Sequence, residues 1–224
     1  MTLSAETRNA VRDGCKRSAA ATLPFIFATL TPGGTPDAML DVGAGEGHWS
    51  AEALRLGVPA VHAIDMESHH RYGVTVYEHD ARLVKLPLWE GKERWPLTLC
   101  LEMAEHLDAA SGDFLVAELC RVSSEIVWSA AIPGQGGDGH VNEQWPAYWA
   151  ERFAAHGYCL DDPGWRLDLW DDARVEPWYA QNLLYAFKAV GLHNVPGVTD
   201  RAPVPLVHPV TWAHHRGVTP PDRS

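Results

Sequence analysis

Short apolar runs alternate with longer amphipathic stretches along most of the chain, and turn residues separate them. Apolar runs of about five residues predict buried strands, whereas longer mixed stretches predict helices. The pattern predicts strands at 38–42, 60–64, 74–77, 97–101, 125–132, 158–161 and 182–188. It predicts helical structure at 5–30, as one or two helices, and at 49–56, 102–107, 111–121 and 144–156.

This alternation predicts a doubly wound α/β fold, in which a mostly parallel, seven-stranded sheet carries helices on both faces. We expect a helical segment over 1–35, the α/β domain over 36–190, and a tail over 191–224 that is rich in proline and histidine. Because prolines recur in the tail, it is expected to lie extended on the domain and to fray at its end.

Composition narrows the classes of function. The chain has 224 residues, enough for one sizeable core, and its formal net charge of −11 argues against charge-driven binding to nucleic acid. We expect no membrane contact, since no run of about 18 apolar residues marks a span. We also expect no secretory signal. The four cysteines form no CxxC pair, so reduced thiols in a cytoplasmic protein are expected.

The clearest signal is a glycine-rich turn between a predicted strand and a predicted helix. Residues 39–47 read MLDVGAGEG, with Asp41 in the strand and glycines at 43, 45 and 47. Glycines let the backbone turn tightly and approach a ligand closely. Asp65 ends the next strand, where a carboxylate can accept both hydroxyls of a ribose.

Two kinds of cofactor fit a glycine loop that is followed by a distal acid. A dinucleotide loop, G-x-G-x-x-G, would need a glycine where this chain has His48, and Glu46 would repel a pyrophosphate. S-adenosylmethionine carries no phosphate, and its sulfonium and ammonium groups are cationic. The acidic loop therefore favours S-adenosylmethionine over a nicotinamide dinucleotide.

Residues 36–190 resemble the class I S-adenosylmethionine-dependent methyltransferases, with the glycine loop as their first motif. The resemblance implies a Rossmann-like fold and S-adenosylmethionine as cofactor. It implies that Asp65 holds the ribose, that Met66 and the Asp80-Ala81 pair border the adenine, and that Leu101 lies beneath the transferable methyl. The implied cofactor residues are Asp41, Gly43, Ala44, Gly45, Gly47, Asp65, Met66, Asp80, Ala81 and Leu101.

A second group of polar residues follows the predicted strand at 97–101. Residues 102–106 read EMAEH, and on a helix positions i, i+3 and i+4 share a face. A later histidine, His140, lies in the loop after the next strand, which emerges at the same sheet edge. This mixed oxygen and nitrogen set suits a divalent Mg, Mn, Fe or Zn ion, and its members are Glu102, Glu105, His106 and His140.

The E-x-x-E-H pattern with a later histidine resembles segments of the ubiquinone-pathway O-methyltransferases and of the plant small-RNA 2′-O-methyltransferases. That resemblance implies a metal that binds acceptor hydroxyls and lowers their pKa, with Glu105, His106 and His140 as catalytic residues. Without a metal, Glu105 would pair locally and His106 would act as general base. The residues themselves leave both readings open.

The acceptor side is predicted from a flexible loop and from aromatic residues. Residues 131–140 are glycine-rich and are expected at the mouth of the site, and aromatics that can cover an acceptor are Trp165, Trp170, Trp178 and Tyr179. His69 and His70 are expected to be a solvated surface pair.

The favoured function is methyl transfer from S-adenosylmethionine to a hydroxyl of a small molecule or glycan. The alternatives are N- or C-methylation without metal, 2′-O-methylation of nucleic acid, a nicotinamide-dependent oxidoreductase and a non-enzymatic cofactor-binding scaffold.

Overall fold

The computed structural model describes residues 5–90, 93–189 and 203–216, and an eight-stranded sheet in the order β3-β4-β2-β1-β5-β6-β8-β7 runs through its centre. Neighbouring strands from β4 to β6 pair in parallel, whereas β3, β8 and β7 pair antiparallel to their neighbours. The strands are β1 (Ala38–Val42), β2 (Ala60–Asp65), β3 (His69–Arg71), β4 (Val74–Glu78), β5 (Trp95–Leu101), β6 (Ser123–Ser129), β7 (Tyr158–Asp161) and β8 (Leu184–Lys188).

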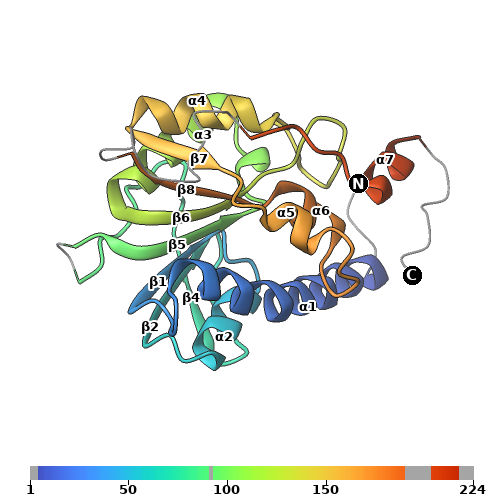
Figure 1. The fold of residues 1–224 in the computed structure, drawn as a ribbon. Coiled ribbons are helices and arrows are strands. Elements are labelled where there is room, and N and C mark those ends of the chain that lie inside the picture. The colour runs from blue at the N-terminus through green and yellow to red at the C-terminus, as the bar shows by residue number, and fades with distance from the viewer. Residues whose placement is uncertain (1–4, 91–92, 190–202, 217–224) are drawn as a thin grey trace.

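Helices cover both faces of the sheet, as Figure 1 shows, with α3 and α4 on one face and α1 and α2 on the other. The helices are α1 (Ala5–Leu30), α2 (His48–Arg55), α3 (Ala109–Val122), α4 (Pro146–Ala155), α5 (Trp165–Leu169), α6 (Pro177–Asn182) and α7 (Pro209–Arg216), with a 3₁₀ turn η1 (Ala104–His106). None of the described helices combines the length and the apolar character that crossing a membrane requires.

Burial on both faces explains why the central strands read as continuous apolar runs. On one face, α3 and α4 contribute Leu115 and Phe153 to the core. On the other face, α1 and α2 contribute Leu23 and Ala53 to a second core cluster. Because β1, β2 and β5 are parallel, their carboxyl ends meet at one edge of the sheet, and the loops that leave this edge form the candidate site.

The structure confirms the predicted doubly wound α/β fold and corrects several elements. The sheet has eight strands rather than seven, because the polar residues 69–71 form a short edge strand. The hairpin that joins β3 to β4 turns at Tyr72 and Gly73, both with positive φ. The short helices α5 and α6 also lie where we predicted no helix.

Two further expectations need correction. The helical turn predicted over 102–107 is present only as the 3₁₀ turn η1, which spans residues 104–106. Within the proline-rich tail, residues 209–216 form the helix α7 rather than an extended strand of chain. Pro209 is compatible with this helix, because the first helical position needs no backbone N–H. The rest of the tail, apart from 203–208, lies outside the described residues.

We predict that Trp128→Ala lowers the free energy of unfolding by about 3–5 kcal/mol, the usual cost of removing a large buried aromatic. Trp128 is fully buried, and its ring lies 5.1 Å from that of Trp149 and 5.2 Å from that of Phe153. Chemical denaturation measures the loss. The control Trp212→Ala, at a position 51% exposed, should change stability by less than about 0.5 kcal/mol; equal losses would contradict the assigned core.

Candidate functional site

The loop between β1 and α2 has a backbone that favours glycine. Gly43, Gly45 and Gly47 have φ angles of 74°, 53° and 83°, in the left-handed region that side chains rarely adopt. A Cβ at Gly43 would also lie 2.7 Å from Cγ of Met103. The N–H groups of Gly43 and Ala44 both donate to the Ile64 carbonyl at 3.0 Å, so the loop is fixed against the end of β2.

Asp65 at the end of β2 also holds this loop. Its Oδ2 accepts a hydrogen bond from Gly45 N at 2.8 Å, and its Oδ1 accepts one from Met66 N at 2.6 Å. His69 Nε2 donates to the Gly45 carbonyl at 2.7 Å, because a carbonyl can only accept. His69 is therefore tied to the glycine loop rather than solvated on the surface, a tertiary contact that its local sequence does not reveal.

Asp41 is buried in β1, beneath the glycine loop. It is 3% exposed, and Ser50 Oγ donates to its Oδ2 at 2.6 Å. Burial raises the pKa of the Asp41 carboxyl to about 6, and the bond from Ser50 offsets only part of that effect. A cationic group of a ligand near Asp41 would stabilise the ionised form.

Two adjoining cavities open at the carboxyl edge of the sheet. The smaller measures about 410 Å³ and includes Asp65, Met66, Asp80 and Ala81 in its wall. The larger measures about 780 Å³ and takes in Asp41, Ala44 and Leu101. Four residues line both cavities and so mark their junction: Gly43, Gly45, Glu102 and His106.

Nine of the ten predicted cofactor residues line one cavity or the other. Gly47 is the exception, since in the described part of the chain it lines neither. Its role is local, because it precedes α2 with a left-handed backbone and packs toward Val74 and Val76. The Asp80 carboxylate is held by two hydrogen bonds from Arg82 at 2.8 Å, and these lower its pKa.

His48 is a candidate site residue that the sequence analysis missed. It begins α2, lines the larger cavity and is only 8% exposed. Its Nε2 atom has no hydrogen-bond partner among the described residues. Burial lowers the pKa of the imidazole, and its ring contacts that of Tyr72 at a tilt of 35°, with the centroids 4.6 Å apart. A buried ring nitrogen that faces a cavity without a partner points to a polar ligand group.

Glu105, His106 and His140 form a compact cluster at the edge of the larger cavity. One potential ligand atom from each lies within 4.8 Å of the others. Glu105 is fully buried, and no described side chain donates a hydrogen bond to its carboxyl group. Desolvation, assisted by the charge of Glu102, raises the pKa of Glu105 to about 9. An unpaired buried carboxyl at a cavity is a costly arrangement that favours a functional role.

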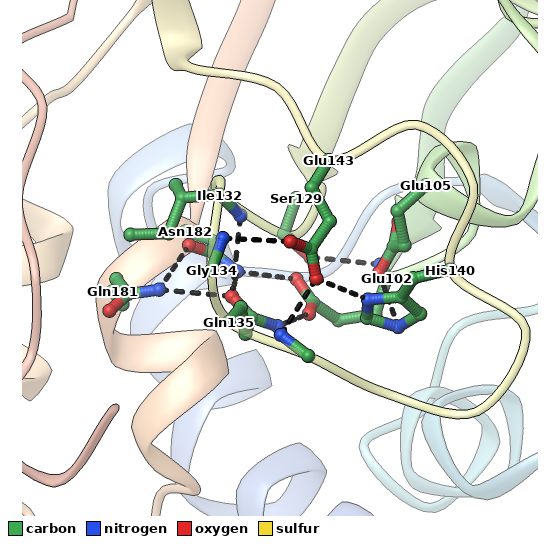
Figure 2. A network of polar contacts seen from close by, with 11 residues as sticks. Glu102, Glu105, Ser129, Ile132, Gly134, Gln135, His140, Glu143, Gln181 and Asn182 are labelled. Atoms are coloured by element: carbon green, nitrogen blue, oxygen red, sulfur yellow. Dashed lines mark hydrogen bonds and ion pairs between the residues drawn. The ribbon is translucent and has the colours of Figure 1, made fainter. Parts of the chain in front are cut away.

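Glu143 fixes the orientation of the His140 ring (Figure 2). Its carboxylate accepts hydrogen bonds from the N–H groups of Gly134 at 2.8 Å and Gly136 at 2.7 Å. It also accepts one from His140 Nδ1 at 2.9 Å. The other ring nitrogen, Nε2, is therefore the unprotonated one in the neutral ring and lies 4.0 Å from Glu105 Oε1. A Cβ at Gly137 would overlap this nitrogen, so the glycine keeps the space in front of it open.

Glu102 is not part of this cluster, contrary to the predicted set of four ligands. Its φ of 50° turns the chain at the end of β5, so residues 102, 105 and 106 do not share a helical face. The carboxylate of Glu102 instead accepts hydrogen bonds from Gln135 Nε2 at 2.8 Å and Asn182 Nδ2 at 3.0 Å.

The loop and the aromatics of the acceptor side are only partly at the site. Residues 135–138 of the glycine-rich loop line the larger cavity, as do Trp178 and Tyr179 from α6. Trp165, by contrast, is 1% exposed and belongs to the core. Trp170 contacts His208 with its ring and does not line the cavity among the described residues.

We predict that Asp41→Asn stabilises the ligand-free protein above pH 6 relative to wild type. Between the unfolded pKa of 3.8 and the folded pKa of about 6, the native state holds a proton that the unfolded state has lost. The contribution of Asp41 to wild-type stability therefore falls across this window, by about 3 kcal/mol in total, and then stays level. Urea unfolding of both proteins from pH 3.5 to 7.5 measures the difference; a gap that does not change with pH would refute the assignment.

No protein-family model matches the chain, and no curated protein matches it by sequence. Several solved structures share its fold. Magnesium protoporphyrin IX methyltransferase from Synechocystis PCC 6803, solved with bound S-adenosylmethionine, has a TM-score of 0.57 at 13% identity, covering 84% of this chain and 86% of its own. The sugar N-methyltransferase KedS8 from Streptoalloteichus sp ATCC 53650 has a TM-score of 0.58 at 15% identity, covering 84% and 94%.

A third similar structure, DesVI from Streptomyces venezuelae, has a TM-score of 0.56 at 11% identity, covering 84% of this chain and 100% of its own. At these identities the likeness concerns the fold and not the substrate. The chain therefore has the fold of solved S-adenosylmethionine-dependent methyltransferases.

Proposed function

We propose that this protein is an S-adenosylmethionine-dependent methyltransferase that acts on a hydroxyl of a small molecule or glycan. The observation that carries the proposal is the pair of adjoining cavities that meet at Gly43, Gly45, Glu102 and His106. A nucleoside fits the smaller cavity, and the larger has room for an amino-acid tail together with an acceptor. The methyl group would then lie near the junction, beside Glu102 and His106.

The smaller cavity supplies the groups that an adenosine needs. Each Asp65 oxygen already accepts one backbone hydrogen bond and keeps a further lone pair for a ribose hydroxyl. Met66, Asp80 and Ala81 line the same cavity and would border the adenine. Because the Asp80 carboxylate is held by Arg82, it is preorganised to accept a hydrogen bond from the base.

The larger cavity supplies partners for the amino-acid tail. Asp41 is a buried acid that would attract the cationic ammonium group. His48 Nε2 makes no hydrogen bond to the described residues at the start of α2, where the helix dipole also favours an anion. The Glu46 carboxylate lies 3.8 Å from this nitrogen, and its charge is paired with Arg71 at 2.9 Å. The tail carboxylate is the group that satisfies both features. The cofactor would therefore extend from Asp65 across the glycine loop to His48.

The transfer step needs a nucleophile in line with the methyl group and a base for its proton. With the cofactor bound, the acceptor oxygen would form a bond to the methyl carbon as the carbon–sulfur bond breaks, and the sulfonium would become a neutral thioether. His106 lies at the junction of the cavities, and burial together with His140 lowers its pKa. A neutral imidazole at physiological pH can accept the hydroxyl proton, so in the metal-free site we propose His106 as general base, with Glu105 and His140 beside it.

The alternative that we propose is a divalent metal held by Glu105, His106 and His140. His106 would then be a metal ligand and not the general base. No described side chain donates a hydrogen bond to the buried carboxyl group of Glu105, and Glu143 orients His140 in the manner of a second-layer carboxylate. One carboxylate and two imidazoles suit Zn, Fe or Mn better than Mg. When bound, the metal supplies a Lewis acid that lowers the pKa of an acceptor hydroxyl.

The remaining expectations fit this proposal without being required by it. A small acceptor agrees with the net charge of −11 better than a nucleic acid does. A cytoplasmic location agrees with the cysteines, because no disulfide joins the four, all of which lie in described segments. The narrower resemblance to the ubiquinone-pathway and small-RNA enzymes stays a prediction.

We predict that variants at the two ends of the proposed cofactor site change the affinities for two ligands in different ways. Asp65→Asn should weaken binding of both S-adenosylhomocysteine and 5′-methylthioadenosine at least about tenfold, since both carry the ribose. His48→Phe keeps an aromatic ring in contact with Tyr72 but loses the ring nitrogens. It should weaken only S-adenosylhomocysteine, because methylthioadenosine lacks the amino-acid tail. Calorimetric titration measures both affinities.

The matched control for Asp65 is Glu67→Gln, an exposed acid two positions away, which should leave both affinities unchanged. Equal losses for the two ligands in His48→Phe would remove His48 from the tail subsite. Unchanged binding of both ligands in Asp65→Asn would contradict the ribose assignment.

We predict that Glu105→Gln and His140→Ala each weaken binding of Zn²⁺ and Mn²⁺ at least about tenfold. Each change removes one of the three ligands, and calorimetry on EDTA-treated protein measures the effect. Glu102→Gln is the matched control, because Glu102 accepts amide hydrogen bonds and lies outside the cluster. If Glu102→Gln weakened metal binding as strongly as Glu105→Gln, Glu102 would be a fourth ligand, as the sequence predicted. If the wild-type protein bound neither ion, the metal site would be excluded.

A further inference from the structure

Residues 203–216, here called the C-terminal segment, form one wall of the larger cavity. Val210 and Thr211 of α7 line it together with Cys15 of α1 and Trp178 of α6. Figure 1 shows α7 beside α6, and the two helices are in contact. Neither Val210 nor Thr211 is among the described residues that line the smaller cavity. The segment therefore borders only the part of the site that lies away from the adenosine.

One buried residue, His208, anchors this segment directly before α7. It is 3% exposed, and its backbone N–H donates to Gln181 Oε1 at 2.8 Å. Its Nε2 donates to the Trp170 carbonyl at 3.0 Å, and its Nδ1 accepts a bond from Val210 N at 3.2 Å. The side chain of His208 thus binds α7 at its first turn and the end of α5 at the same time.

Gln181 links this anchor to the junction of the cavities (Figure 2). Its Nε2 donates to Gln135 Oε1 at 3.0 Å and to Asn182 Oδ1 at 2.9 Å. Gln135 and Asn182 both donate to the Glu102 carboxylate. A continuous chain of hydrogen bonds therefore runs from the C-terminal segment to Glu102, and each amide in it has a defined orientation because donors and acceptors alternate.

We infer that the C-terminal segment is the wall that selects the acceptor, and that Gln181 is the positioning residue that fixes this wall relative to Glu102. The inference rests on the proposed function, since it assigns to the acceptor the part of the larger cavity that the cofactor tail does not need.

The chemistry of this wall indicates the class of acceptor. Val11, Trp178 and Val210 offer apolar surface. The polar side chains that line the cavity from the same helices include Arg12, Cys15 and Thr211. A free sugar, hydrated on all sides, would lose more hydrogen bonds to water than these groups replace. The acceptor that fits is a hydroxyl carried on an apolar body, with that body against α7.

Cys15 provides a direct reporter of this wall, because it lines the cavity while Cys100 and Cys120 are buried. Alkylation by iodoacetamide at pH 8.5, quantified at Cys15 by peptide mass spectrometry, measures access to the acceptor side. Gln181→Leu and His208→Ala should each raise the rate about tenfold, since local opening governs access. Trp212→Ala, on the exposed side of the same helix, is the matched control and should leave the rate unchanged.

A second variant tests the wall without disturbing its anchor. Thr211→Trp fills the cavity from α7 and should slow Cys15 alkylation severalfold while the affinity for S-adenosylhomocysteine stays within about twofold. In wild-type protein with S-adenosylhomocysteine bound, 2-naphthol should slow the alkylation of Cys15, whereas methyl α-glucoside should not.

The outcomes separate this inference from the proposed function. Unchanged rates of Cys15 alkylation in both Gln181→Leu and Thr211→Trp would contradict the assignment of the C-terminal segment as the acceptor wall. Slower Cys15 alkylation with the glucoside rather than with the naphthol would contradict an acceptor that carries its hydroxyl on an apolar body. Failure of wild type to bind S-adenosylhomocysteine, with the Cys15 rates responding as expected, would overturn the proposed cofactor instead.

Discussion

The loop after β1 is held to the end of β2 by three backbone N–H groups, two donating to the Ile64 carbonyl and one to the Asp65 carboxylate. This arrangement needs left-handed backbone at Gly43 and Gly45. It fixes Asp65 at the mouth of the smaller cavity and leaves the first turn of α2 facing the larger one. Both cavities share the walls of this one loop, so the rest of the site depends on it.

Buried carboxyl groups define the remainder of the site, and their surroundings differ. Asp41 is partly compensated by Ser50, and Glu102 is compensated by two side-chain amides. Glu105 has no such side-chain partner among the described residues, although its side chain is fully buried. Glu102 is stabilised by hydrogen bonds, whereas its neighbour Glu105 is not stabilised by any described side chain. Glu105 is therefore the place where a proton or a cation would bind, beside His106 and His140.

Local patterns predicted the parts of this structure that local physics controls. Apolar runs located the central strands, and the glycine spacing located the loop and Asp65. The polar strand β3 shows no alternation of apolar and polar residues, so its sequence did not predict a strand. The prolines near α7 led to the prediction of an extended tail where a helix forms. The turn at Glu102 depends on a positive φ at a non-glycine residue, which no pattern indicates. The links from Gln181 to His208 and from His69 to Gly45 join distant segments, so they follow from the tertiary fold alone.

The central claim is that the glycine loop and Asp65 bind S-adenosylmethionine rather than a dinucleotide. The most direct measurement is calorimetric titration of the wild-type protein with S-adenosylhomocysteine and, in parallel, with NAD⁺. The account predicts one site for S-adenosylhomocysteine with a dissociation constant of about 10 µM or tighter, and no heat of binding with NAD⁺. Binding of NAD⁺ at this site, or no binding of S-adenosylhomocysteine, would contradict it.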